Sequence, residues 1–336
     1  MDDQDRDDGF IFDAYPEMVP SGPSTWEKFF TFLVYITFAT AFIFLVMSIF
    51  FTLDPSWGSS LTQPVNPFIF ILLIVLSFPQ VSLLSIFVVM FILYLIFFSS
   101  MVYENRRERK KKLLDTPIGY FIAAATAVEV VVVIITLLEN YFGTPIGGGG
   151  IDTELKNNPL LGYMSLIYAP FVEELGFRIL PLGIFSALLV LFSIRTRGEH
   201  APESMRDTLL AIILPGHIRR KYDLPLRGAD WVLIIITSII FGYAHIFFGG
   251  WDWGKFIPVF ITGIALAIGF LKFGAYVDIP FHWFFNGFLT LYNIEPSLYG
   301  ATNLLVIWLL FVGVVSIISI LMYARERLRR GGTAPA

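Results

Sequence analysis

Two adjacent glutamates and an arginine lie in an apolar stretch, at a spacing suited to proton chemistry. Glu173 and Glu174 are followed by Arg178. Residues four apart share a helix face, so Glu174 and Arg178 can pair, whereas Glu173 is rotated by about 100° and faces another neighbour. A carboxylate in hydrocarbon costs about 2.5 kcal/mol or more, which favours a functional reason for two of them. We expect Glu173 to be free for proton transfer; the alternative is a structural brace plus a second glutamate satisfied by backbone or water.

Two later apolar segments carry further polar residues at helical spacing. Phe241 precedes His245 by four residues, and His282 precedes Asn286 by four. Each pair shares one face of a helix and can point at a common cavity. A single histidine in an apolar helix is often only structural, so each motif is weak alone. Together with the glutamates, they predict a polar cluster buried in the membrane.

The composition of the chain indicates whether it folds in water or in a lipid bilayer. Its 336 residues are 56% hydrophobic and 15% charged, and the mean hydropathy is +0.72. A soluble protein has about 25% charged residues, so most of this chain requires a lipid bilayer as partner. Cysteine is absent, which excludes a thiol nucleophile and a thiolate zinc site. The basic run at 106–112 directly follows an apolar segment, so we expect a cytoplasmic anchor and no nucleic-acid partner.

The apolar segments predict an all-α, polytopic transmembrane helical bundle of about eight spans, since one crossing needs about 20 residues. Segment 68–101 is long and contains Pro79, so we expect a short kinked or re-entrant piece followed by a span from Val81; the alternative is two very short spans. Segment 160–194 should kink at Pro170 and Pro181. The remaining spans are expected at 29–53, 118–141, 231–248, 256–273, 279–292 and 304–323.

The basic residues predict the orientation of the bundle. They cluster at 106–112, at 195–197 with 219–221, and at 325–330, after alternate spans. Loops rich in Lys and Arg stay on the cytoplasmic side of a membrane. We therefore expect an integral, multi-pass protein, in a prokaryotic plasma membrane, with both termini cytoplasmic.

The ordered set of motifs resembles that of a known family, the CAAX protease and bacteriocin-processing (CPBP, Abi-type) intramembrane glutamic endopeptidases, which include the type II CAAX prenyl proteases. The family motifs EExxxR, FxxxH and HxxxN correspond to residues 173–178, 241–245 and 282–286. The resemblance covers roughly 160–294. Together with the apolar segments and the charged ends, it gives an acidic N-terminal tail at 1–27, N-terminal transmembrane helices at 28–141, a catalytic membrane domain at 159–323 and a basic cytoplasmic tail at 324–336.

The resemblance implies an endopeptidase that hydrolyses a peptide bond of an unidentified peptide or protein substrate near the cytoplasmic membrane face. Glu173 would act as general base with His245 holding the water, and His282 and Asn286 would stabilise the oxyanion. Glu174, positioned by Arg178, would support the site. The full predicted catalytic set is Glu173, Glu174, Arg178, His245, His282 and Asn286.

Three alternatives remain open at this stage. A zinc-dependent CAAX-type metalloprotease could use Glu173, His245 and His282 as ligands, but HExxH is absent and we favour a mechanism without metal or other cofactor. A proton-coupled transporter would also bury such residues, although no internal repeat is visible. A non-catalytic immunity or scaffold protein of the membrane would tolerate loss of motif residues, and here the set is complete.

Overall fold

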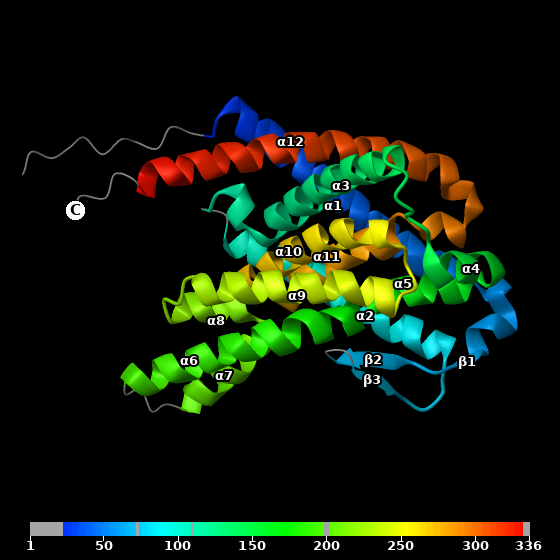
Figure 1. Cartoon of the computed structure of the whole chain (residues 1–336), viewed down its shortest axis with the longest axis horizontal. Coiled ribbons are helices and arrows are strands. Elements are labelled where there is room, and N and C mark those ends of the chain that lie inside the picture. The colour runs from blue at the N-terminus through cyan, green and yellow to red at the C-terminus, as the bar shows by residue number, and fades with distance from the viewer. Residues whose placement is uncertain (1–22, 72–73, 109–110, 198–201, 332–336) are drawn as a thin grey trace, which may run out of the picture.

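The computed structural model describes residues 23–71, 74–108, 111–197 and 202–331, and it is an all-α bundle with two very small sheets (Figure 1). The α-helices are α1 Thr25–Thr52, α2 Leu83–Arg107, α3 Pro117–Tyr141, α4 Gly149–Asn157, α5 Pro159–Glu174, α6 Ile184–Arg197, α7 Pro202–Ile213, α8 Pro215–Lys221, α9 Gly228–Phe247, α10 Phe256–Lys272, α11 Ala275–Trp283 and α12 Tyr299–Gly331. The strands are β1 Pro64–Val65, β2 Phe68–Ile71, β3 Ile74–Ser77 and β4 Val81–Ser82.

Within the described residues, seven helices are long and apolar enough to cross a membrane, one fewer than the eight spans predicted. The difference is segment 279–292. There the structure has α11, which is short, followed by a π-helical turn at Phe284–Phe288. Nearly every residue of α11 is buried, and α2, α3, α5 and α10 surround it. Hydropathy cannot distinguish a helix buried by protein from one that faces lipid, so the sequence could not show that this segment is a short, buried helix.

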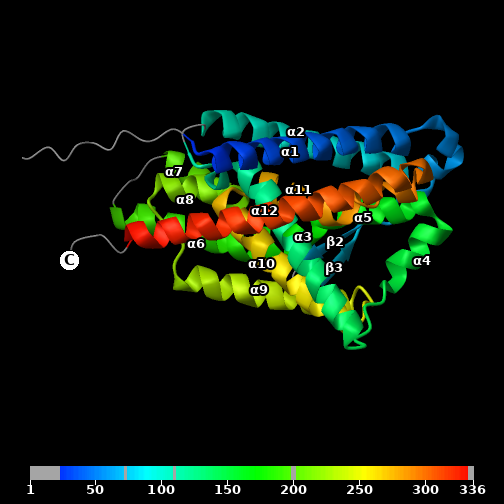
Figure 2. The ribbon, with the colours of Figure 1, turned by 90° about the horizontal axis from the view of Figure 1, so that it is seen from above.

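The helices run between two ends of the molecule. Figure 1 shows α7 and α8 at one end, together with the last turns of α12, and α4 and β1 at the opposite end. Figure 2 shows the same bundle from above, with α1 and α2 forming one side and α9 the other. We call the first the basic end, because Lys111, Lys112, Arg219 and Arg220 meet there around one surface depression.

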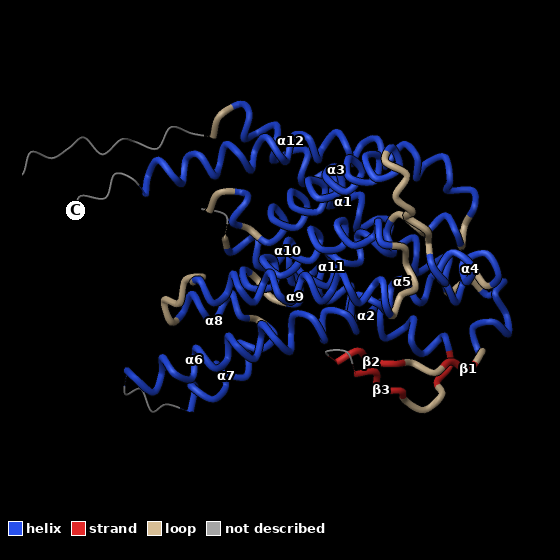
Figure 3. Tube along the Cα trace, in the orientation of Figure 1, coloured by secondary structure: helices blue, strands red, loops and turns tan. Residues whose placement is uncertain are grey.

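Segment 68–101 contains a re-entrant piece, as predicted, but its backbone is β rather than helical. β2 pairs antiparallel with β3, and β1 pairs with β4 on either side of them in the sequence, so the segment enters and leaves beside β1 (Figure 3). The sequence here is rich in β-branched and aromatic residues, which favour strands, and Pro67 and Pro79 flank it and oppose a helix. The membrane helix α2 begins at Leu83, two residues after the predicted Val81.

The predicted kink in segment 160–194 is a change of helix type. α5 ends at Glu174, a π-helical stretch runs from Leu175 to Gly183, and α6 continues. Pro181 lies inside the wide stretch and cannot donate a backbone hydrogen bond, which disfavours regular α geometry there. Single π turns inside helices are frequent at functional sites. The two glutamates therefore stand at the junction between the two helix types.

The terminal regions differ in part from the predicted domain limits. α1 begins at Thr25 with Ser24 as its N-cap, and residues 1–22 of the predicted acidic tail lie outside the described residues. The predicted basic tail at 324–336 begins inside α12, which continues to Gly331. A run of basic residues has no hydropathy signal, so the sequence could not show that the last helix continues past residue 323.

Candidate active site

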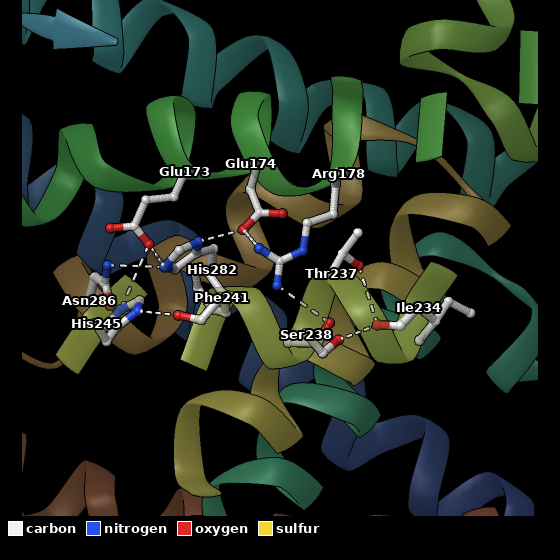
Figure 4. A network of polar contacts seen from close by, with 11 residues as sticks. Glu173, Glu174, Arg178, Ile234, Thr237, Ser238, Phe241, His245, His282 and Asn286 are labelled. Carbon is white, nitrogen blue, oxygen red and sulfur yellow. Dashed lines mark hydrogen bonds and ion pairs between the residues drawn. The ribbon is translucent and has the colours of Figure 1, made fainter. Parts of the chain in front are cut away.

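Glu174 is the centre of a buried polar brace. Its Oε1 accepts hydrogen bonds from Arg178 Nη1 at 3.1 Å and from His282 Nδ1 at 2.7 Å (Figure 4). The side chains of Glu174 and Arg178 are both 0% exposed. The predicted pair across one helical turn is therefore present, and it also orients a histidine on α11. Hydrogen bonds to a charged group are stronger than neutral ones, so this brace fixes α11 against α5.

Glu173 faces the other way, as the helical spacing predicted. Its Oε2 lies 3.5 Å from His282 Nε2 and 3.8 Å from His245 Nε2, and this atom is buried without a hydrogen-bond partner among the described residues. His245 Nδ1 donates to the backbone oxygen of Phe241 at 3.0 Å, which leaves the Nε2 lone pair directed at Glu173. Glu173 Oε2 and His245 Nε2 are both acceptors and lie 3.8 Å apart, so a water between them could donate a hydrogen bond to each.

Phe241 of the second motif is an apolar partner for three of the polar residues. The Arg178 guanidinium lies over its ring, 4.1 Å from the centroid, and the rings of His245 and His282 meet it edge to face. Helix α10 approaches α9 closely at Gly263. The backbone oxygen of Gly263 accepts a hydrogen bond from Arg178 Nη2 at 3.4 Å. A Cβ at this glycine would lie 3.2 Å from the Phe241 ring.

Asn286 completes the set from the π-helical turn that follows α11. Its Nδ2 lies 3.2 Å from His282 Nε2 and donates to it. Thr290 in turn donates to the backbone oxygen of Asn286, which fixes this turn. The structure thus brings all six predicted site residues together from α5, α9 and α11 with the segments that follow α5 and α11.

Asp278 is a site residue that the sequence reasoning missed. It lies one helical turn before His282, is 0% exposed, and neither of its carboxyl oxygens has a hydrogen-bond donor among the described residues. Its carboxyl interacts electrostatically with that of Glu174. The available signal was an acid four residues before a motif histidine in an apolar segment.

A cavity of about 340 Å³ opens beside the free glutamate. Glu173, His245 and Asn286 contribute to its lining, as do Phe68 and Phe70 of β2. The Phe70 ring stacks on Phe177, one helical turn beyond Glu173. The β hairpin is therefore a wall of the cavity. The glutamate side chain is 23% exposed, so a substrate in the cavity can reach it.

The same cavity contains one cationic side chain. Lys255 lines it and lies over the Trp251 ring, 4.2 Å from the centroid. It also interacts electrostatically with Glu129 of α3 and with Glu173. Glu129 lies midway along the apolar helix α3, where Lys255 is the positive charge that acts on it.

The donor set does not fit the zinc site considered from the sequence. No group of three or more His, Asp or Glu side chains in the described parts of the chain is arranged to hold a metal ion. His282 is engaged on both ring nitrogens, by Glu174 at Nδ1 and by the Asn286 amide at Nε2. Its Nε2 lone pair would have to leave that amide before it could bind a metal.

Comparison with known proteins agrees with the motifs. Residues 156–288 match the model of the family described as type II CAAX prenyl endopeptidase Rce1-like. Neither a curated protein nor a solved structure matches the chain. The matched segment begins just before α5 and ends with the π-helical turn that carries Asn286, so it contains all six site residues. Residues 156–288 of this integral membrane protein are therefore similar to the Rce1-like type II CAAX prenyl endopeptidases.

Proposed function

We propose that the protein is an intramembrane endopeptidase in which Glu173 is the general base for attack of water on a peptide bond. The observation that carries this proposal is the unpartnered Oε2 of Glu173, which faces the Nε2 atoms of His245 and His282 inside the cavity. Carboxylate and imidazole groups within reach of one water are suited to deprotonate it as it attacks.

In the proposed reaction, the water lies between Glu173 Oε2 and His245 Nε2. The carboxylate takes one proton while the oxygen bonds to the substrate carbonyl, giving a tetrahedral intermediate with an oxyanion. The Glu173 carboxyl then passes that proton to the leaving amine as the carbon–nitrogen bond breaks. The products are a new carboxyl terminus and a new amino terminus, and the glutamate returns to its starting state.

The oxyanion requires hydrogen-bond donors that are held in place. Asn286 offers an amide N–H that does not titrate, and it lies at the cavity wall. His282 offers a second donor when its Nε2 carries a proton, and Glu174 holds that ring at Nδ1. Arg178 is a positioning residue in this scheme, since it acts through Glu174.

The test compares new protein termini in membranes from cells that express the wild type, Glu173→Gln or Glu129→Gln. Glu173→Gln keeps shape and hydrogen bonding but removes the proton acceptor, so cleavage should fall about 10²–10⁴-fold. Glu129→Gln is the matched control, because it makes the same change in a membrane helix outside the motifs. If membranes with well-folded Glu173→Gln contained the same new termini as membranes with the wild type, the proposal would be refuted.

A chelator arm of the same experiment addresses zinc. Cleavage by the wild type should persist after treatment with a strong chelator, because the His282 ring is engaged on both nitrogens. Loss of cleavage that added zinc restores would show that the histidines exchange these partners for a metal.

A further inference from the structure

We infer that Asp278 holds a proton against Glu174, and that this proton keeps His282 neutral so that the carboxylate of Glu173 stays free to accept from water. Asp278 is 0% exposed and lies outside the cavity lining, so it is a positioning residue that acts through Glu174 and His282. The inference rests on the proposed function, since it explains how the general base of that reaction is kept available.

The first observation is an unequal distribution of donors over the Glu174 carboxylate. Its Oε1 accepts two hydrogen bonds, from Arg178 Nη1 and from His282 Nδ1 (Figure 4). Its Oε2 is buried, and no donor of the described residues reaches it. A buried oxygen without a donor retains the cost of its lost hydration. Glu174 therefore needs one more donor, on the Oε2 side.

The second observation is the carboxyl of Asp278 beside it. Both of its oxygens are buried and lack a donor among the described residues, and it interacts electrostatically with Glu174. Two neighbouring carboxylates in a buried place repel each other, and each has also lost its hydration. A proton on Asp278 removes this repulsion. The O–H group it creates is the donor that Glu174 Oε2 lacks.

The net charge of the buried cluster leads to the same proton. His282 donates from Nδ1 to Glu174 and accepts at Nε2 from Asn286, so its ring is neutral in this arrangement. Arg178 then supplies one positive charge against two carboxyls. With both carboxyls ionised, a fully buried cluster would carry an uncompensated negative charge, whereas with one proton its charge is zero.

The proton belongs on Asp278 and not on Glu174. Glu174 faces the guanidinium of Arg178 and accepts two hydrogen bonds, which favours its charged form. One effect opposes a proton on Asp278, because this residue lies in the first turn of α11, where the helix dipole favours negative charge. That preference is smaller than the cost of a buried carboxylate without any donor.

The other elements packed against α11 supply no further partner. Tyr94 of α2, Tyr120 of α3 and Lys272 of α10 each donate to other oxygens. The π-helical turn at 284–288 contains no titratable residue. The charges that act on the buried carboxyl are those of Glu174 and Arg178. Its protonation is therefore coupled directly to the brace that holds His282.

A neutral His282 keeps the general base available. Its Nε2 lies 3.5 Å from Glu173 Oε2. If Asp278 lost its proton, the added negative charge would favour an imidazolium at His282. The new Nε2–H would then pair with Glu173, and the carboxylate would be held in an ion pair instead of accepting from water.

The first test is infrared spectroscopy of the purified full-length wild type and of Asp278→Asn. A protonated carboxyl and a carboxylate absorb at separate frequencies. The difference between the two spectra at neutral pH should contain the band of one protonated carboxyl. A carboxylate band in its place would overturn the inference. This measurement requires no activity, so its failure is distinct from failure of the proposed hydrolysis.

The second test is the pH profile of cleavage. Asp278 loses its proton as the pH rises, so cleavage by the wild type should fall on the alkaline side. In Asp278→Asn, an amide N–H that does not titrate faces Glu174 Oε2, so the alkaline limb should lie at higher pH. Coincident alkaline limbs in the two proteins would overturn the inference.

Two further variants separate the donor from the shape of the side chain. Asp278→Ala supplies no donor to Glu174, so cleavage should be about tenfold slower, and Asp278→Asn should recover most of this loss. Asp230→Asn is the matched control for stability, because Asp230 is also buried but accepts from Arg219 as a carboxylate. Its melting temperature should fall, and that of Asp278→Asn should not. Cleavage by Asp278→Asn as slow as by Asp278→Ala would show that the charge of Asp278 is required, which would overturn the inference.

Discussion

At the residue scale, two neighbouring glutamates have different environments because a helix separates them by about 100°. Glu174 is fully buried between Arg178 and His282, whereas Glu173 reaches the cavity. The i to i+4 spacing was enough to predict this division from the sequence. It could not predict Asp278, because the contact of that carboxyl with Glu174 depends on the packing of α11 against α5.

The brace makes a prediction about stability. Arg178→Ala leaves the Glu174 carboxylate buried without its cation, and removing half of a buried pair costs about 3–5 kcal/mol. The variant should therefore show a lower melting temperature in detergent. Replacing both partners, as in Glu174→Gln with Arg178→Met, removes the uncompensated charge and should recover most of the stability.

A thermal unfolding series on the single and double variants measures this difference. Activity should stay low in both, since His282 has lost its charged partner in the double variant. A double variant as unstable as Arg178→Ala would mean that the guanidinium contributes through its contact with Phe241 and not through the ion pair.

At the element scale, the prolines predicted where the backbone departs from a regular α-helix but not which structure it adopts there. Pro181 marked the interruption after the glutamates, and Pro79 marked the end of the re-entrant piece. Whether a helix kinks, widens to π geometry or gives way to strands depends on which tertiary partners accept the displaced backbone. Phe70 on Phe177 is such a partner, and it joins segments more than 100 residues apart.

The contact between α9 and α10 makes a prediction about packing. In Gly263→Ala, the new methyl group would lie 3.2 Å from Phe241 and 3.3 Å from Arg178 Nη2. Overpacking of this kind costs about 1–3 kcal/mol, and here it also displaces two site residues. We expect lower stability and a larger loss of cleavage.

Gly300→Ala in α12 is the matched control, because a methyl group there meets nothing within 4 Å. It should be neutral or slightly stabilising, by less than about 1 kcal/mol. Melting temperature and cleavage are measured on both variants. Equal behaviour of the two would show that α10 moves away from α9 without cost.

At the scale of the whole molecule, the fold class followed from composition and the hydrophobic segments. The number of long apolar helices did not, because α11 is short and is buried among its protein neighbours. The chain nevertheless passes between the two ends eight times when α11 is included. Its first and last helices therefore have their outer termini at the same end (Figure 1).

This arrangement predicts the relative position of the two chain ends. Ser24→Cys, just before α1, and Arg325→Cys, near the end of α12, should both be labelled from the cytoplasmic side, since both positions are exposed at the basic end. Labelling with a membrane-impermeant maleimide, on intact cells and separately on inverted vesicles, shows on which side of the membrane each cysteine lies. Labelling from opposite sides would mean that α11 does not complete a crossing.

The β hairpin also has a consequence for the bilayer around the protein. β3 pairs with β2 on one side only, and its four residues are exposed. A sheet edge with unpaired backbone groups does not occur against hydrocarbon. We therefore expect headgroups or water to cover β3, and the membrane to be thinner beside the cavity. Such a local depression brings the reactant that hydrolysis consumes to the level of Glu173 and shortens the path of an extended segment into the site.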